Sequence, residues 1–318
     1  MSKMLPKTLI YHPDAAEYAD RLAGRAPDLP LLATSEPEQL ALYLPDAEIL
    51  ICGPKAVPGI ASAQKLRWIQ LTMAGAELLA PEAHAIGHLM VTNARGLHAE
   101  LMSDHAMAAM VMLQWDFPKL FRNQAERRWE RSARMPLAGR VLGVVGSGSI
   151  GSEIGRRASE FGMTVYGVRR SGTGTPPGFT TMYGPAELDQ LLPQCDFVCV
   201  VVPATPETDR MFGAAQFAAM KPGAYFINIA RGSVVDEPAL IAALQERRIA
   251  GAALDVFAEE PPRFDNPLWT MPNVIITPHV SGMAASNEAR LVDLFLDNLS
   301  RFQAGQPLRN PVDPRRGY

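Results

Sequence analysis

Three segments of the chain carry side chains that could together reduce a carbonyl group: Arg231, Glu260 and His279. A histidine exchanges a proton near neutral pH, and a carboxylate against its other ring nitrogen would fix the tautomer and favour the imidazolium. An arginine can grip a substrate carboxylate and polarise a ketone. Each also has a structural interpretation: Arg231 in a surface ion pair, His279 as a satisfied core histidine, Glu260 as a solvated loop charge. Because all three follow strands of one predicted sheet, we interpret them jointly as a site that reduces small 2-keto acids.

A glycine-rich loop lies between an apolar run and a segment with helical periodicity. The loop is Gly146-Ser147-Gly148-Ser149-Ile150-Gly151, and the apolar run before it covers residues 141–145. Ile154, Ala158 and Phe161 recur at helical spacing after it. A strand, a turn and a helix in this order are what a dinucleotide-binding loop requires.

The glycines of this loop have separate roles that follow from their size. Gly146 permits the tight turn, Gly148 lets a pyrophosphate approach the backbone, and Gly151 lets the helix pack closely on the strand. The amides of Ser149 and Ile150 at the helix N-terminus can then donate to the phosphates. The alternative is a glycine-rich turn with no ligand.

The next predicted strand ends, about 20 residues beyond the loop, at the position that reads the adenosine ribose. This chain has Arg169, Arg170 and Ser171 there, where NAD enzymes place Asp or Glu. A carboxylate would repel a 2′-phosphate, whereas guanidinium groups can grip it through paired hydrogen bonds. We therefore expect NADP(H) to be preferred and NAD(H) to be possible. The alternative is that two arginines at a strand end are merely solvated.

Short apolar runs alternate with helical stretches in two series, a pattern typical of parallel sheets covered by helices on both faces. The first series comprises residues 8–11, 29–34, 48–52, 66–71 and 89–93. The second series comprises residues 140–145, 164–168, 197–202, 225–229, 252–256 and 274–277. The sequence thus predicts an α/β fold of two domains, Rossmann-like or flavodoxin-like, each with a parallel sheet.

Two further helices are predicted to connect these domains. Residues 100–115 are apolar nearly all round and rich in methionine, which favours core or subunit packing and a homodimer. Apolar residues recur at helical spacing again over residues 291–302. If that helix returns to the first lobe, residues 1–98 and 286–318 form the substrate domain and residues 99–285 an inserted dinucleotide-binding domain. The cleft between the domains is then the expected place for chemistry.

Composition and charge argue against several classes of protein. Hydrophobic residues make up 47% and charged residues 20% of the 318 residues, as in globular rather than disordered chains. A net charge of −3 without a Lys/Arg block predicts no basic surface that would bind a nucleic acid or an anionic membrane. No apolar core of signal-peptide length follows Met1, and no run reaches the ~18 residues of a membrane span. We therefore expect a cytoplasmic protein.

No metal is expected, because Arg231 and His279 can supply the charge stabilisation. His84 and His88 have the spacing of a helical metal pair but lack a third ligand, so an exposed loop is the better interpretation. Asp104 and His105 lie early on the predicted helix of residues 100–115, either as helix-end charges or at the rim of a pocket. The cysteines, Cys52, Cys195 and Cys199, are interpreted as buried core residues.

The chain resembles the D-isomer-specific 2-hydroxyacid dehydrogenase family over nearly its whole length. The blocks that carry the resemblance are residues 144–151, 202–208, 220–232, 253–257 with Glu260-Pro261, and 273–279. The resemblance implies that the catalytic residues are Arg231, Glu260 and His279. Glu260 is preferred to Glu259 because the family's glutamate directly precedes a proline.

The resemblance also implies contacts to substrate and cofactor. The backbone of Met73-Ala74-Gly75 would bind the substrate carboxylate, unless that segment is a plain turn, and Asp255 would hold the nicotinamide amide. Arg231 and His279 would contact both ligands. Further cofactor contacts are expected at Pro203, Thr208, Ile229, Ala230 and Gly282. Asp236 is more simply the N-cap of the next helix.

The substrate stays open at this point. Glyoxylate or hydroxypyruvate is favoured, because their reduction is common among NADP-preferring members of the family. The alternatives are another small acid such as phosphoglycerate, or a dinucleotide-sensing, corepressor-like binding protein that uses the same fold.

Overall fold

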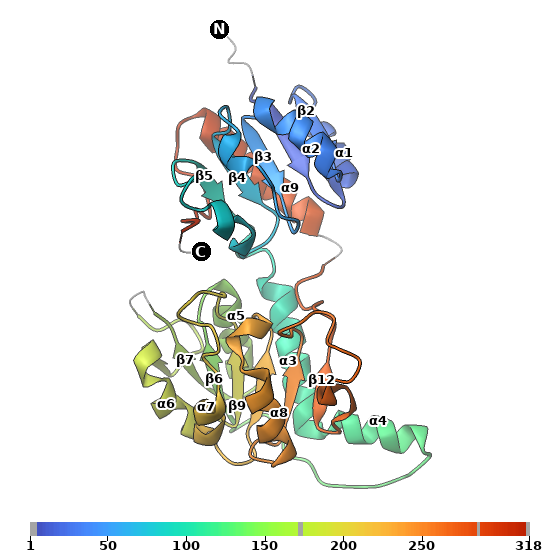
Figure 1. The fold of residues 1–318 in the computed structure, drawn as a ribbon. Coiled ribbons are helices and arrows are strands. Elements are labelled where there is room, and N and C mark those ends of the chain that lie inside the picture. Colours follow the sequence, from blue (N-terminus) through green and yellow to red (C-terminus); the bar gives the residue numbers. More distant parts are fainter. Residues whose placement is uncertain (1–4, 171–173, 285–286, 316–318) are drawn as a thin grey trace. The chain divides into compact units, whose positions relative to one another are not determined.

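The computed structural model describes residues 5–170, 174–284 and 287–315, which form two compact units (Figure 1). The first unit comprises Met1–Leu97 and Ala284–Tyr318, and the second comprises His98–Met283. The second unit is therefore inserted into the sequence of the first. Each unit is described by itself below.

The first unit is built on a parallel sheet with the strand order β2-β1-β3-β4-β5. Its strands are β1 (Thr8–Tyr11), β2 (Leu31–Thr34), β3 (Ile49–Cys52), β4 (Trp68–Leu71) and β5 (Met90–Thr92). Its helices are α1 (Ala15–Ala23), α2 (Pro37–Tyr43) and α9 (Asn287–Gln303), with short 3-10 turns η1 (Leu44–Asp46), η2 (Ile60–Ser62) and η3 (Glu77–Glu82). In Figure 1 the red α9 lies against the blue sheet, so the end of the chain completes the unit formed by its beginning.

Alternate residues along these strands face opposite layers of helices, as a period of two residues requires. Ile49 and Ile51 of β3 pack in the cluster that contains α1 and α9, whereas Leu50 packs in the cluster on the other face. The rings of Trp68 and Phe295 stack with their centroids 5.2 Å apart, which fixes α9 on β4.

The second unit has the strand order β12-β11-β10-β9-β6-β7-β8, again parallel throughout its described pairs. Its strands are β6 (Val141–Val145), β7 (Thr164–Val168), β8 (Thr181–Tyr183), β9 (Phe197–Val200), β10 (Tyr225–Asn228), β11 (Gly251–Leu254) and β12 (Val274–Ile276). Its helices are α3 (Ala99–Trp115), α4 (Phe117–Ala125), α5 (Ser149–Glu160), α6 (Leu188–Leu191), α7 (Ala214–Ala219) and α8 (Glu237–Gln245), with 3-10 turns η4 (Pro185–Glu187), η5 (Leu192–Gln194), η6 (Gly232–Val234) and η7 (Pro267–Thr270). The order reverses between β6 and β9, and in open α/β sheets ligands bind beyond the carboxyl ends of the strands at such a point.

Helices cover both faces of this sheet. Val144 packs with Ile154 of α5 and Met110 of α3 on one face, whereas Val145 packs with Leu240 of α8 on the other. The predicted apolar helix of residues 100–115 is thus α3, and its methionines Met107 and Met110 are buried within this unit.

The structure corrects some details of the sequence prediction. The apolar runs continue past the ends of several strands; the run 197–202, for example, contains β9 only to Val200. Strand β8 was missed, because its residues are half-buried at the edge of the sheet and give no apolar run. Phe161 does not continue the buried face of Ile154 and Ala158, because it follows the last residue of α5 and is 51% exposed.

Two other expectations are confirmed. The three cysteines are buried, and burial raises the pKa of Cys52 and Cys199 to about 12, so these thiols stay protonated. Asp236 is the N-cap of α8, where its side chain accepts a hydrogen bond from the amide of Ala239. Within the described residues, no helix is long and apolar enough to cross a bilayer.

Candidate active site

The glycine-rich loop has the shape that a pyrophosphate needs. Gly146 has a φ of 105°, and a Cβ there would lie 2.8 Å from the backbone of Val201. A Cβ on Gly151 would lie 2.0 Å from the carbonyl oxygen of Gly146, so a larger residue would force α5 away from β6. At Gly148, in contrast, a Cβ would meet nothing within 4 Å, so the loop is open on the side where a ligand would lie.

Ser147 adds a second sign of a ligand at this loop. The residue is only 6% exposed, and its hydroxyl is buried without a hydrogen-bond partner among the described residues. Buried hydroxyls are nearly always paired in folded proteins. Helix α5 begins directly after this loop, so the amides of Ser149 and Ile150 belong to its first turn. The loop therefore fits a phosphate-bearing cofactor, whose oxygens could accept from these donors.

The basic residues after β7 lie at the strand end where the ribose position was expected. Arg169 is half-buried, its amide donates to the carbonyl of Tyr183, and its guanidinium donates to the carbonyl of Gly174. Arg170 is exposed. The pKa of Glu207 is lowered mainly by a hydrogen bond from Thr205 and in smaller part by the charge of Arg170. Ser171 lies outside the described residues.

His279 and Glu260 are brought together as the chemistry requires. His279 Nδ1 is 2.7 Å from Glu260 Oε2, while Glu260 Oε1 accepts from the amide of Phe257 at 3.0 Å. The side chains of His279 and Glu260 are 47% and 37% exposed, so a small molecule can reach the imidazole. Because the carboxylate contacts Nδ1, the other ring nitrogen, Nε2, is left for a substrate.

Asp255 fixes the loop that carries His279. The residue is 1% exposed, and its carboxylate accepts from the amides of Val280 and Ser281, both at 3.0 Å, and from the Thr277 hydroxyl at 2.5 Å. Its carbonyl accepts from the amide of His279 at 2.8 Å. Burial raises the pKa of the Asp255 carboxyl, but the hydrogen bonds from Ser281, Thr277 and Val280 outweigh burial and hold it below its usual range. Asp255 is therefore ionised and anchors the loop.

Arg231 is placed by the turn after β10. The side-chain amide of the buried Asn228 donates to the carbonyl of Arg231 at 3.1 Å and accepts from the amide of Ala230 at 3.0 Å. The next residue, Gly232, lies so close to Phe257 that a Cβ would be 1.9 Å from its carbonyl carbon. The turn that carries Arg231 and the backbone that supports Glu260 are thus in direct contact. Sequence reasoning missed Asn228, although a polar residue ending a buried strand was a signal.

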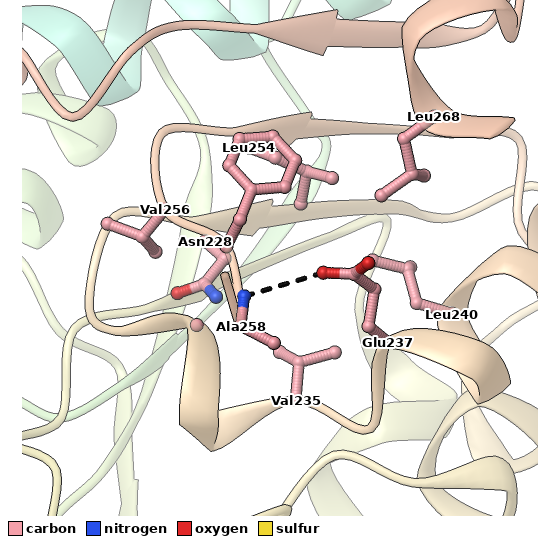
Figure 2. Close-up of a pocket in the computed structure, with 10 residues that line it drawn as sticks. Asn228, Val235, Glu237, Leu240, Leu254, Val256, Ala258 and Leu268 are labelled. Carbon is pink, nitrogen blue, oxygen red and sulfur yellow. Dashed lines mark hydrogen bonds between the residues drawn. The ribbon is translucent and has the colours of Figure 1, made fainter. Parts of the chain in front are cut away.

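Glu237 ties the first turn of α8 to the segment around Glu260. Its carboxylate accepts from the amide of Ala258 at 3.4 Å and from the side chain of Asn266 at 2.7 Å. Figure 2 shows Glu237 directed at the Ala258 backbone across a small cavity. The cavity measures about 10 Å³, room for about one water molecule, so it is no substrate pocket. Like Asn228, Glu237 supports the backbone near the site and was not identified from the sequence.

The segment Met73-Ala74-Gly75 belongs to the first unit and follows β4. The carbonyl of Met73 accepts from the amide of Ala94 at 2.9 Å, and the carbonyl of Ala74 accepts from the Asn93 side chain at 2.5 Å. Hydrogen bonds to these two carbonyls therefore fix the backbone of the turn at two consecutive residues. It is therefore a fixed turn rather than a free loop.

The remaining predicted contacts lie on the loops of the second unit. The Thr208 hydroxyl donates to the carbonyl of Pro203 at 2.6 Å, which closes the loop after β9. Ile229 and Ala230 are buried at the end of β10, and Gly282 lies beside Met102 of α3. Within the described residues, no group of acidic, histidine or cysteine side chains could hold a metal ion.

Comparison with known proteins identifies the family. A sequence model of the D-isomer specific 2-hydroxyacid dehydrogenase NAD-binding domain matches residues 107–281. The glyoxylate/hydroxypyruvate reductase B of Citrobacter koseri is 43% identical over 179 residues, 55% of this chain and 54% of that protein. The match with that relative thus spans about half of its length.

Two solved structures resemble nearly the whole chain. A D-isomer specific 2-hydroxyacid dehydrogenase family protein from Aeromonas salmonicida is 37% identical, with a TM-score of 0.86 over 96% of this chain and 98% of that one. A D-isomer specific 2-hydroxyacid dehydrogenase from Xanthobacter autotrophicus, solved with NADPH and MES, is 29% identical, with a TM-score of 0.87 over 99% of this chain and 100% of that one. The chain therefore belongs to the D-isomer specific 2-hydroxyacid dehydrogenase family, an oxidoreductase family that uses a nicotinamide dinucleotide.

Proposed function

We propose that this protein is an NADPH-dependent reductase of small 2-keto acids, with glyoxylate or hydroxypyruvate as substrate. The observation that carries the proposal is the contact of 2.7 Å between His279 Nδ1 and Glu260 Oε2. A dinucleotide-binding fold without catalysis has no need of a partly exposed imidazole held by a carboxylate.

The proton chemistry follows from that contact. An ionised Glu260 keeps a hydrogen on Nδ1 of His279 and stabilises the imidazolium, so Nε2 can donate its proton to the keto oxygen as the alcohol forms. The bound nicotinamide supplies the hydride. We assign charge neutralisation and orientation of the substrate to Arg231, because the turn that carries it contacts the backbone that supports Glu260.

The substrate class is proposed from charge and from the relatives. A 2-keto acid carries a carboxylate beside its ketone, and we assign that carboxylate to Arg231 and to the backbone of Met73-Ala74-Gly75. The name of the Citrobacter koseri relative supports glyoxylate and hydroxypyruvate among the possible acids. Asp255 is assigned to the nicotinamide amide.

The preference for NADP(H) is proposed from Arg169 and Arg170. Their position after β7 is where a ribose 2′-phosphate would lie, and neither neighbour in sequence is acidic. The NADPH bound in the Xanthobacter autotrophicus structure supports the same choice. Substitution R169D should shift the ratio of kcat/KM for NADPH over NADH toward NADH by more than tenfold.

A homodimer is proposed from exposed apolar side chains on and after α4. Phe121, Trp129 and Met135 are 53%, 93% and 62% exposed, and all three belong to one stretch of the second unit. Contiguous apolar patches mark contact sites in folded proteins, and we infer that these side chains contribute to such a patch. Light scattering coupled to size exclusion should give twice the chain mass, and W129E should lower it; a monomeric wild type contradicts the dimer.

The central test is a steady-state panel of glyoxylate, hydroxypyruvate, pyruvate and bulkier keto acids with NADPH and with NADH. We expect turnover on glyoxylate and hydroxypyruvate, a higher kcat/KM with NADPH than with NADH, and a loss of kcat by orders of magnitude in H279A with NADPH binding retained. Binding of NADPH without turnover across the panel would favour the alternative of a dinucleotide-sensing protein.

A further inference from the structure

His105 contacts the loop that carries His279 through the hydroxyl of Thr277. It lies near the start of α3, with Nε2 3.0 Å from the Thr277 hydroxyl and 3.9 Å from an Asp255 carboxylate oxygen. Its side chain is 21% exposed, and its Nδ1 is buried without a partner among the described residues. Leaving a buried nitrogen unmatched costs free energy, and the hydrogen bond of Nε2 offsets part of that cost.

The hydrogen bonds around Thr277 run in one direction. A threonine hydroxyl has a single hydrogen, and the ionised carboxylate of Asp255, 2.5 Å away, can only accept it. Thr277 therefore donates to Asp255 and accepts from His105. This places the hydrogen of His105 on Nε2 and leaves Nδ1 as the unmatched atom.

The carboxylate at the end of this chain holds the catalytic loop. Asp255 accepts from the amides of Val280 and Ser281 through its side chain and from the amide of His279 through its carbonyl. His279 has a φ of 52°, a conformation that is unfavourable for a residue other than glycine and persists only where its surroundings enforce it. An Asp255 fixed in place is one such constraint.

We propose that His105 is a positioning residue for the reaction assigned above. By donating to Thr277 it directs the hydroxyl at Asp255, and so keeps residues 277–281, with His279, in the conformation that contacts Glu260. The inference rests on the proposed function for the reaction it serves, whereas the hydrogen bonds themselves can be tested without turnover.

Four variants separate this role from general stability. In H105Q the amide nitrogen can replace Nε2 as a donor, whereas H105L fills a similar space without one. T277V removes the hydroxyl at nearly constant volume. L113A creates a cavity at the buried far end of α3 and serves as the matched control, because Leu113 is an apolar core residue about two helical turns beyond His105.

Hydrogen exchange read by mass spectrometry is the first measurement. The amides of Val280 and Ser281 report directly on the Asp255 carboxylate. We expect peptides that cover residues 277–281 to exchange about tenfold faster in H105L and T277V, the fold-change that one buried hydrogen bond is worth. H105Q should match the wild type, and H105L/T277V should exchange no faster than either single variant. Wild-type exchange in H105L, or the same increase in H105Q or L113A, overturns the proposal.

Steady-state kinetics is the second measurement. We expect kcat for keto-acid reduction to fall about tenfold in H105L and to recover to within about twofold in H105Q. L113A should keep its kcat at a temperature where it is folded. A wild type without turnover on any keto acid would refute the proposed function, and the exchange comparison would still decide the role of His105. Equal losses of kcat in H105L and H105Q would refute the positioning role.

Discussion

Replacing Gly232 by alanine tests whether the packing of the Arg231 turn against Phe257 positions the Glu260 carboxylate. The glycine does not need a left-handed backbone, so alanine is conformationally allowed and only the contact opposes it. A Cβ would lie 1.9 Å from the carbonyl carbon and oxygen of Phe257, whereas ordinary contact begins at 3.4 Å. The backbones must therefore separate by about 1.5 Å, the difference between 3.4 and 1.9 Å.

That displacement reaches the Glu260 carboxylate through a single hydrogen bond. The amide of Phe257 donates to Glu260 Oε1 at 3.0 Å, and Glu260 Oε2 contacts His279. A misplacement of about 1 Å in an active site can cost roughly 100-fold in rate. Overpacking of this kind costs about 1 to 3 kcal/mol, which corresponds to a fall in Tm of roughly 2 to 5 °C for a protein of this size.

The assay is NADPH oxidation with saturating keto acid at 25 °C, combined with thermal unfolding. G24A is the control, because Gly24 has helical backbone angles and a Cβ there would lie 3.6 Å from its nearest neighbour. We expect kcat of G232A to fall about 100-fold while the protein stays folded at 25 °C, and G24A to behave as the wild type. A folded G232A with wild-type kcat would refute the reasoning, since the contact would then not position Glu260.

Three further predictions follow from the contacts of the site. N93A removes the hydrogen bond to the carbonyl of Ala74, so KM for the keto acid should rise about tenfold with kcat changed much less; an unchanged KM in steady-state kinetics would contradict this. E237A leaves the side chain of Asn266 without its acceptor and should lower the free energy of unfolding by about 2 kcal/mol in urea titrations, whereas E237Q, which keeps one acceptor, should lose less. Because the pKa of Asp255 is lowered in the folded state, its contribution to stability is present above the unfolded pKa of about 3.9 and is lost as the pH falls through the folded value. D255N should therefore be less stable than the wild type at pH 7, and urea titrations should show the difference shrinking below about pH 4; a difference that is constant with pH would contradict the sign.

Most of the fold could be predicted because the central strands of both sheets are buried on both faces. Continuous apolar runs such as Val141–Val145 indicate strands of this kind. The run over 197–202 misplaced the end of β9, because apolar residues continue into the loop. Strand β8 could not be predicted, since a three-residue edge strand with half-buried side chains has neither an apolar run nor a clear alternation.

The contact between the candidate catalytic residues Glu260 and His279 could be predicted from the sequence, whereas the packing that holds them could not. Arg231, Glu260 and His279 have chemistry that the sequence displays, and strand ends of a parallel sheet meet at one edge. The close approach of Gly232 to Phe257, in contrast, depends on how two loops pack, and no spacing in the sequence contains it. His105 is separated from Thr277 by most of the second unit, so their contact also required the fold.

Because α9 packs on the first sheet, the two units cannot complete their folding in the order in which they begin in the sequence. Phe295 completes the stack on Trp68, and Asn298 donates to the carbonyl of Arg309 next to the bridge between Thr92 and Pro311. On a ribosome the second unit, His98–Met283, emerges whole while the first still lacks these parts. The unit that starts first is thus the last to finish, and until then the apolar face around Trp68 stays exposed to chaperones and to neighbouring chains.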